Sequence, residues 1–155
     1  MEENEICKRI IILINENNVD AKLASLEEIL YLLAAKKYFI IEQLLQENIV
    51  SNLIKFLNHS NFEIQEKSLE ILFDLSNNEE LNQTQNLIDS GILKSMTKLL
   101  ESSDLKIAQK SAEFLSKFTI DSNEYIQAIC DAGLISPLID LLYKDSPKAQ
   151  KVNDC

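Results

Sequence analysis

The sequence predicts an all-α fold built from repeated three-helix units, and three observations support this. The chain of 155 residues contains only two glycines and two prolines, too few for the turns of a β-sandwich or a doubly wound sheet. The sequence repeats with a period of 42–43 residues. Within each period, apolar residues recur at the three-to-four spacing of an amphipathic helix.

The repeat is clearest when residues 49–76 are aligned with residues 92–119 at an offset of 43. The apolar pairs in this alignment are Ile49 with Ile92, Leu57 with Leu100, Ile64 with Ile107, and Leu72 with Leu115. A backward offset of 43 and a forward offset of 42 extend the match towards both ends of the chain. Three comparisons therefore give nearly one period.

Each unit is expected to contain three helices. The short first helices are expected at 39–46, 82–89 and 124–131. The second helices are expected at 5–15, 50–58, 93–101 and 136–143, and the longer third helices at 19–33, 63–75 and 106–118. We expect one domain, 1–155, whose units cover approximately 1–34, 35–77, 78–120 and 121–155, the first and last being incomplete.

The turns agree with this division. Between the first and second helices, Asn48, Gly91 and Gly133 occupy one position. A helix that ends in the left-handed conformation favours Gly there, with Asn as the usual second choice. The turn before each third helix is rich in Asn, Ser and Asp, which cap the free N–H groups at a helix start.

Composition limits the partners and the compartment. The formal net charge of −10 disfavours nucleic acid and anionic membrane surfaces, and any partner steered by charge is expected to be basic. The three cysteines form neither a metal-binding spacing nor a disulfide pattern. The apolar run near the N-terminus is too short for a signal peptide or a membrane span, so the cytoplasm or the nucleus is the expected compartment.

No motif indicates catalysis. His59, the single histidine, lies in a polar turn, and no nucleophile or general acid–base pair can be assembled around it. The sequence has no nucleotide-binding or metalloprotease motif. We therefore expect no enzyme activity, no catalytic residue, no metal and no cofactor.

Residues 87–119, LIDSGILKSMTKLLESSDLKIAQKSAEFLSKFT, resemble the armadillo repeat. In that family a small residue and Gly open the second helix, "LL" closes it, and a β-branched residue starts the third. The resemblance covers nearly the whole chain. It implies a right-handed α-solenoid of about three and a half repeats, whose third helices line a concave groove that binds extended partners.

The chain departs from one pattern of that family. Nuclear import adaptors and β-catenin-like proteins carry a Trp in the third helix and an Asn four residues later. The Trp positions are Glu27, Glu70 and Glu113 here, and the Asn positions are Tyr31, Asp74 and Lys117. The chain contains no Trp, so the import-adaptor way of reading a nuclear localisation signal is not expected.

The three glutamates allow two interpretations. As a row along the groove, extended by Asp74, they would bind a basic extended segment or a basic helix. Alternatively, they belong to a solvated helix face, paired with lysines three or four residues away. The predicted groove residues are Glu27, Tyr31, Lys67, Glu70, Asp74, Lys110, Glu113 and Lys117.

The ends of the array are out of phase with the repeat. The chain ends where a third helix would start, so Leu138, Leu141 and Leu142 are expected to lack its cover. Uncovered apolar residues of this kind mark interfaces. A homo-oligomer, a subunit of a larger assembly and a fragment of a longer protein all fit this pattern.

The function expected from these observations is a non-catalytic adaptor or scaffold that binds a protein partner in its groove. One alternative is a structural subunit or homo-oligomer held through its uncapped ends. Another is a chaperone co-factor of the armadillo type. Fold alone does not choose among them.

Overall fold

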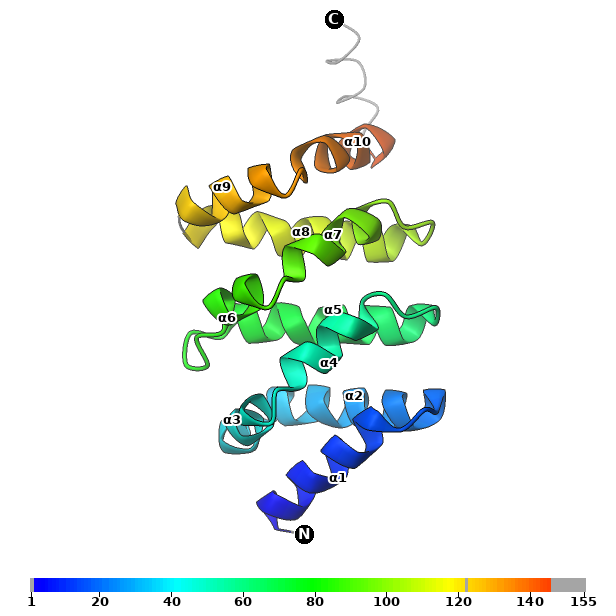
Figure 1. Ribbon diagram of the computed structural model, residues 1–155, viewed down its shortest axis with the longest axis vertical. Helices are drawn as coiled ribbons and strands as arrows, with labels where there is room; N and C mark the ends of the chain where they lie inside the picture. The colour runs from blue at the N-terminus through cyan, green and yellow to red at the C-terminus, as the bar shows by residue number, and fades with distance from the viewer. Residues whose placement is uncertain (1, 122, 146–155) are drawn as a thin grey trace, which may run out of the picture. The chain divides into compact units, whose positions relative to one another are not determined.

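The computed structural model describes residues 2–121 and 123–145, apart from the side chains at 120, 121, 142, 144 and 145. The chain divides into two compact units, Met1–Ile92 and Leu93–Cys155. The helices are α1 (Glu3–Asn15), α2 (Val19–Ala34), α3 (Tyr38–Gln46), α4 (Ile49–Phe56), α5 (Phe62–Asn77), α6 (Thr84–Asp89), α7 (Ile92–Leu100), α8 (Leu105–Asp121), α9 (Asn123–Asp131) and α10 (Ile135–Asp145) (Figure 1).

Every predicted helix is present, in the predicted order of short first, second and long third helices. The boundaries shift by a few residues. For example, α6 begins at Thr84 rather than at Asn82, because Asn82 has a φ of 50° and so cannot continue a right-handed helix. In the other direction, α8 continues beyond Phe118 to Asp121.

The predicted left-handed turns are also present. The φ angles are 61° at Asn48, 88° at Gly91 and 74° at Gly133. A Cβ atom added to either glycine would meet no heavy atom within 4 Å. The backbone conformation, rather than a lack of space, therefore selects Gly or Asn at this position.

The third helices begin with side-chain caps, as predicted from the polar turns. Asn18 Oδ1 accepts a hydrogen bond from the Ala21 N–H at 3.0 Å. Asn61 Oδ1 accepts from the Ile64 N–H, also at 3.0 Å. At the start of α8, Asp104 Oδ1 accepts from the Lys106 N–H at 3.0 Å. Each turn thus satisfies one of the N–H groups that a helix start leaves free.

The core of the first unit forms where α5 packs against α2 and α4. Leu26 and Ile29 on α2, Leu53 on α4, and Ile64 and Leu72 on α5 are all 0% exposed. This packing places the two third helices side by side (Figure 1). The exposed face of this pair is the candidate groove.

In the second unit, α8 packs with α9 and α10. Phe114 and Phe118 on α8 are fully buried, with ring centroids 5.2 Å apart. The Phe118 ring also lies 6.0 Å from that of Tyr125 on α9, in an edge-to-face arrangement. These aromatic contacts join α8 to α9 within a core that is otherwise aliphatic, as in the first unit.

Candidate functional site: an acidic pocket between α2 and α5

A surface pocket of about 630 Å³ lies between α2 and α5, within the first unit. We call it the α2–α5 pocket, and its lining residues are Glu27, Leu30, Tyr31, Leu33, Ala34, Glu70, Asp74, Asn77 and Asn78. Four of the predicted groove residues, Glu27, Tyr31, Glu70 and Asp74, therefore line one pocket. Its volume lies within the range of ordinary ligand pockets.

Three carboxylates give the pocket its charge. Glu27 and Glu70 are exposed, whereas Asp74 is half-buried. Burial raises the pKa of the Asp74 carboxyl above its usual value of 3.8, and the neighbouring Glu70 carboxylate raises it further. Burial and the Glu70 carboxylate thus both disfavour the ionised form of Asp74. A cation placed beside the carboxylate would stabilise that form.

The walls of the pocket supply apolar contacts as well. Leu30, Leu33 and Ala34 line it, and the Tyr31 side chain remains 68% exposed at its edge. An aromatic face and aliphatic groups beside carboxylates suit a side chain with an apolar stem and a cationic head. Lysine and arginine have this form.

Lys67 lies at the margin of this cluster. Its Nζ is 3.9 Å from Glu27 Oε1 and 4.0 Å from Glu63 Oε1. The described ion pairs do not include the sequence-expected pair of Lys67 with Glu70. Because the Glu27 side chain is 61% exposed, its pair with Lys67 is a weak surface contact that a competing cation can replace.

The ends of the helices add to the negative potential. Neither α2 nor α5 carries a basic residue in its last turn, and the pocket is lined by the C-terminal halves of both helices. The second helices differ, since α4 has Lys55 and α7 has Lys98 in the last turn. A helix C-terminus carries partial negative charge, which a nearby cation stabilises.

The remaining predicted groove residues, Lys110, Glu113 and Lys117, lie on α8 in the second unit. Glu113 is exposed, and both lysines are partly buried. That Glu113 continues the row of groove glutamates begun by Glu27 and Glu70 remains a prediction.

The predicted end residues lie on α10, where a second hollow of about 400 Å³ is present. We call this hollow the α8–α10 trough, and its lining residues are Gln109, Ala112, Leu115, Ser116, Thr119, Leu138 and Leu141. Leu138 is partly exposed, but Leu141 is only 5% exposed, because α10 packs against α8. The Leu142 side chain lies outside the described residues.

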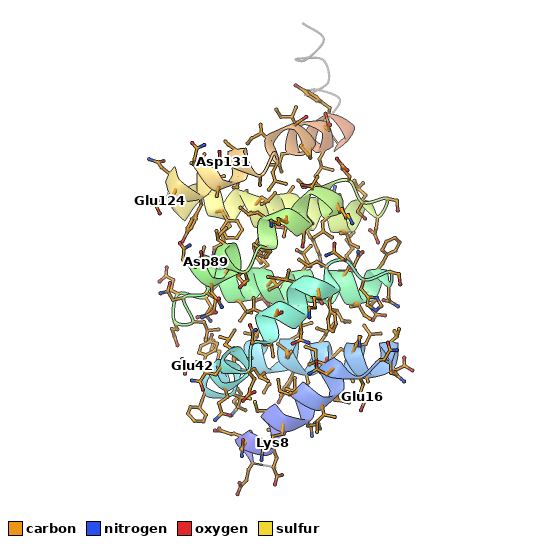
Figure 2. All side chains as sticks on the ribbon, in the orientation of Figure 1. Lys8, Glu16, Glu42, Asp89, Glu124 and Asp131 are labelled. Carbon is orange, nitrogen blue, oxygen red and sulfur yellow. The ribbon has the colours of Figure 1, made fainter. Side chains whose placement is uncertain are left out.

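Carboxylates also occur away from the pocket. Glu16 follows α1, Glu42 lies on α3, and Asp89 ends α6 (Figure 2). These residues contribute to the net charge without belonging to the pocket, so they provide matched controls for experiments on it.

In the part of the chain that the structure describes, no group of three or more His, Cys, Asp or Glu side chains is arranged to hold a metal ion. Within the same residues, no helix has both the length and the apolar character needed to cross a membrane.

Sequence reasoning missed five of the pocket residues: Leu30, Leu33, Ala34, Asn77 and Asn78. Helical spacing from Glu27, Glu70 and Asp74 would have placed most of them on the same face. The pair between Lys67 and Glu27 had no such signal, because it joins two helices and depends on how they pack.

Comparison with known proteins agrees with this architecture. The sequence model of the armadillo/beta-catenin-like repeat matches residues 122–152. No curated protein matches the chain at a significant level.

Several solved structures are similar in fold. One is an engineered protein, 22% identical over 96% of this chain and 59% of that chain, with a TM-score of 0.77. Another is a designed armadillo repeat protein, 22% identical over 96% of this chain and 60% of that chain, with a TM-score of 0.76. A third, solved with the peptide (KR)4, is 20% identical over 92% of this chain and 59% of that chain, with a TM-score of 0.76.

The chain therefore spans about three-fifths of the length of these structures. At such identities the similarity establishes the fold. The predicted all-α, armadillo-type fold class and the resemblance to the armadillo repeat are both confirmed.

Proposed function

We propose that this armadillo-type chain is a non-catalytic protein-binding module, and that its α2–α5 pocket holds a Lys or Arg side chain of an extended partner segment. The observation that carries the proposal is the composition of the pocket. Three carboxylates, Glu27, Glu70 and Asp74, share a hollow with Tyr31 and an aliphatic wall.

Electrostatics favour a cationic occupant over a neutral one. Burial and the Glu70 carboxylate both disfavour the ionised form of Asp74, so the approach of a guanidinium or ammonium group restores a favourable environment. The C-terminal ends of α2 and α5, whose last turns carry no basic residue, act in the same direction. The net charge of −10 would also speed the encounter with a basic partner.

The structural relatives support the general form of this binding. One similar protein is described as designed for modular peptide recognition, and another was solved with the basic peptide (KR)4. These statements concern those designed proteins. For the present chain they support a protein partner, and the basic character of that partner rests on its own pocket.

The experiment is a binding titration with fluorescent (KR)4 peptide as the probe. A double variant, Glu70→Gln with Asp74→Asn, removes two charges from the pocket and keeps the size of both side chains. We expect its affinity for the peptide to fall about tenfold or more, as for charge-assisted contacts of this kind. Raising the salt concentration should reduce the difference in peptide affinity between the unmodified chain and the double variant.

The matched control removes the same charge elsewhere, through Glu16→Gln with Glu42→Gln. We expect this variant to change the affinity by less than about twofold, because both residues lie outside the pocket. Equal losses in the two variants would mean that only net charge attracts the peptide, and the proposed pocket would be rejected.

A specific observation also favours the alternative of a subunit held through its end. On α10, Ile135 is 44% and Ile139 43% exposed, whereas the second helix α4 buries Ile49, Val50, Leu53 and Phe56. A natural partner whose binding survives the Glu70→Gln/Asp74→Asn change but fails after Ile139→Asp would indicate this alternative.

A further inference from the structure

The α2–α5 pocket offers its occupant two carboxylates from one helix. Glu70 and Asp74 are four residues apart on α5, so they lie one turn apart on the same face of that helix. Both residues line the pocket. In residues 2–121 and 123–145, which the structure describes, no ion pair involves either of them. These two carboxylates are therefore the acceptors that a bound basic side chain can use.

The third carboxylate of the pocket, Glu27, already has a cation of the chain beside it. Lys67 Nζ lies 3.9 Å from Glu27 Oε1 and 4.0 Å from Glu63 Oε1. Both distances exceed that of a hydrogen bond, so this ammonium group acts as a point charge near the two carboxylates. Lys67 lies on the same helix as Glu70, yet it pairs with Glu27 on α2. The chain thus supplies a lysine for Glu27 and leaves Glu70 and Asp74 to the occupant.

A guanidinium group suits two carboxylates one turn apart better than an ammonium group does. Its N–H groups lie in one plane and point in several fixed directions, so it can donate to both carboxylates at once. An ammonium group is a compact charge that holds its water more strongly. Because Asp74 is half-buried, a group that approaches its carboxylate must give up part of its water. This loss of water costs a guanidinium group less than an ammonium group.

Tyr31 provides a flat surface at the edge of the pocket. Its side chain is 68% exposed. Among the described residues, the Tyr31 ring makes no aromatic or cation–π contact, whereas the Phe56 ring already has Lys22 Nζ 5.6 Å from its centroid. Guanidinium planes stack on aromatic faces while their edges donate hydrogen bonds. One arginine side chain can therefore place its face on Tyr31 and its edge beside the carboxylates.

We propose that the α2–α5 pocket selects arginine over lysine, with the guanidinium group between Glu70 and Asp74 and its face on the Tyr31 ring. This inference rests on the proposed function, because it names the basic residue that the pocket holds. Lys67 remains beside Glu27 in this arrangement. A partner segment that contains lysine but no arginine would accordingly bind more weakly than an arginine-containing segment of the same charge.

The experiment compares two fluorescent, acetylated and amidated peptides of equal length and charge, (KR)4 and (KK)4. We expect (KR)4 to bind the unmodified chain about tenfold more tightly, because only its guanidinium groups can donate to both carboxylates at once. The Glu70→Gln/Asp74→Asn variant should lose most of this preference, since the two acceptors become neutral. Equal affinity of the two peptides for the unmodified chain, or an unchanged preference in the variant, would overturn the proposal.

A second variant tests the aromatic face. Tyr31→Leu should weaken (KR)4 binding about threefold or more and (KK)4 binding by less than about twofold, because stacking favours the guanidinium group. The matched control is Phe39→Leu, which removes an aromatic ring that is 61% exposed on α3 and lies outside the pocket. We expect this control to change neither affinity by more than about twofold. Equal losses of (KR)4 affinity in the two variants would contradict the placement of arginine on Tyr31.

A third peptide tests the hydrogen bonds. It carries ω-N,N-dimethylarginine in place of each arginine of (KR)4, which keeps the charge and removes N–H donors. We expect its affinity for the unmodified chain to lie about fivefold or more below that of (KR)4. If the methylated peptide binds as tightly as (KR)4, charge alone attracts it, and the placement of the guanidinium group between Glu70 and Asp74 is wrong.

These titrations distinguish failure of this proposal from failure of the proposed function. If (KR)4 and (KK)4 bind equally tightly and both lose affinity in the Glu70→Gln/Asp74→Asn variant, the pocket holds basic side chains without selecting arginine. The proposed function then stands, and the selectivity for arginine is rejected. If neither peptide responds to that variant, the pocket is not the binding site, and both proposals are rejected.

Discussion

The helices α4 and α10 hold the same place in the repeat but have different surroundings. Both begin after a left-handed residue, Asn48 or Gly133, and both carry apolar residues at matching positions. Yet α4 buries Val50 and Leu53 almost completely, while Ile135 on α10 remains 44% exposed. Since α5 packs against α4, the difference indicates that neighbouring helices, and not apolar content alone, decide how far a second helix is buried.

The largest expected effect tests this comparison directly. Leu53→Ala should lower the free energy of unfolding by about 2–4 kcal/mol, because Leu53 is 0% exposed and its loss leaves a cavity. The matching change on α10, Leu138→Ala, should cost less than about 1 kcal/mol, because that side chain is already partly exposed. Urea denaturation of the two variants measures both values, and equal losses would contradict the comparison.

Hydrogen exchange should show the same contrast without mutation. Amides of α10 are expected to exchange about tenfold or more faster than those of α4, since a helix with less apolar cover opens at lower cost. Exchange measured by mass spectrometry on peptides from 49–56 and 135–145 would test this.

The negative charge of Asp74 in the α2–α5 pocket is expected to lower the stability of the folded chain at neutral pH. Burial and Glu70 raise the pKa of Asp74, so the folded chain keeps this proton at a higher pH than the unfolded chain does. The contribution of Asp74 to stability therefore falls as pH rises from its ordinary pKa of 3.8 through the raised value. At neutral pH, Asp74→Asn should raise stability, by less than about 1 kcal/mol because solvent screens a half-buried group.

Thermal unfolding over a pH series would measure this gain, which should shrink as the pH approaches 3.8. The control is Asp140→Asn on α10, an exposed position where no gain is expected. A gain of equal size in both variants would indicate that the reduced net charge, and not the surroundings of Asp74, is responsible.

The smallest expected effect concerns the pair of Lys67 with Glu27. Lys67→Met should change the stability of the first unit by only a few tenths of a kcal/mol, since exposed ion pairs contribute little. The same variant should bind the (KR)4 peptide more tightly, because it removes the cation that competes for Glu27. Parallel denaturation and binding titrations would separate the two effects. Weaker peptide binding would show that Lys67 helps to form the site.

Much of the fold could be predicted from the sequence because the signals are local and repeated. The left-handed turn at Asn48 follows from a residue preference, and the cap at Asn61 follows from a polar turn before an apolar stripe. The period then supports each local interpretation with two or three independent copies. Helix ends were predicted less well, as the extension of α8 to Asp121 shows.

The candidate site was only partly predictable. Register placed Glu27 and Glu70 at equivalent positions, but it could not show that Lys67 turns to Glu27 on the neighbouring helix. The raised pKa of Asp74 depends on how deeply the packed helices bury its carboxyl. Leu141 was expected to lie uncovered, yet it is nearly buried, because contact between α8 and α10 cannot be read from either helix alone.

The caps at Asn18, Asn61 and Asp104 also have a consequence for how such a chain can evolve. Each third helix is N-capped by a residue of the turn that precedes it. The capped N–H group at the start of each helix therefore needs no partner from a distant part of the sequence. An in-frame duplication of 43 codons, the distance from Asn18 to Asn61, would carry a complete start signal with it. Unequal recombination between copies could therefore lengthen or shorten the gene by whole units while each new helix remained properly begun.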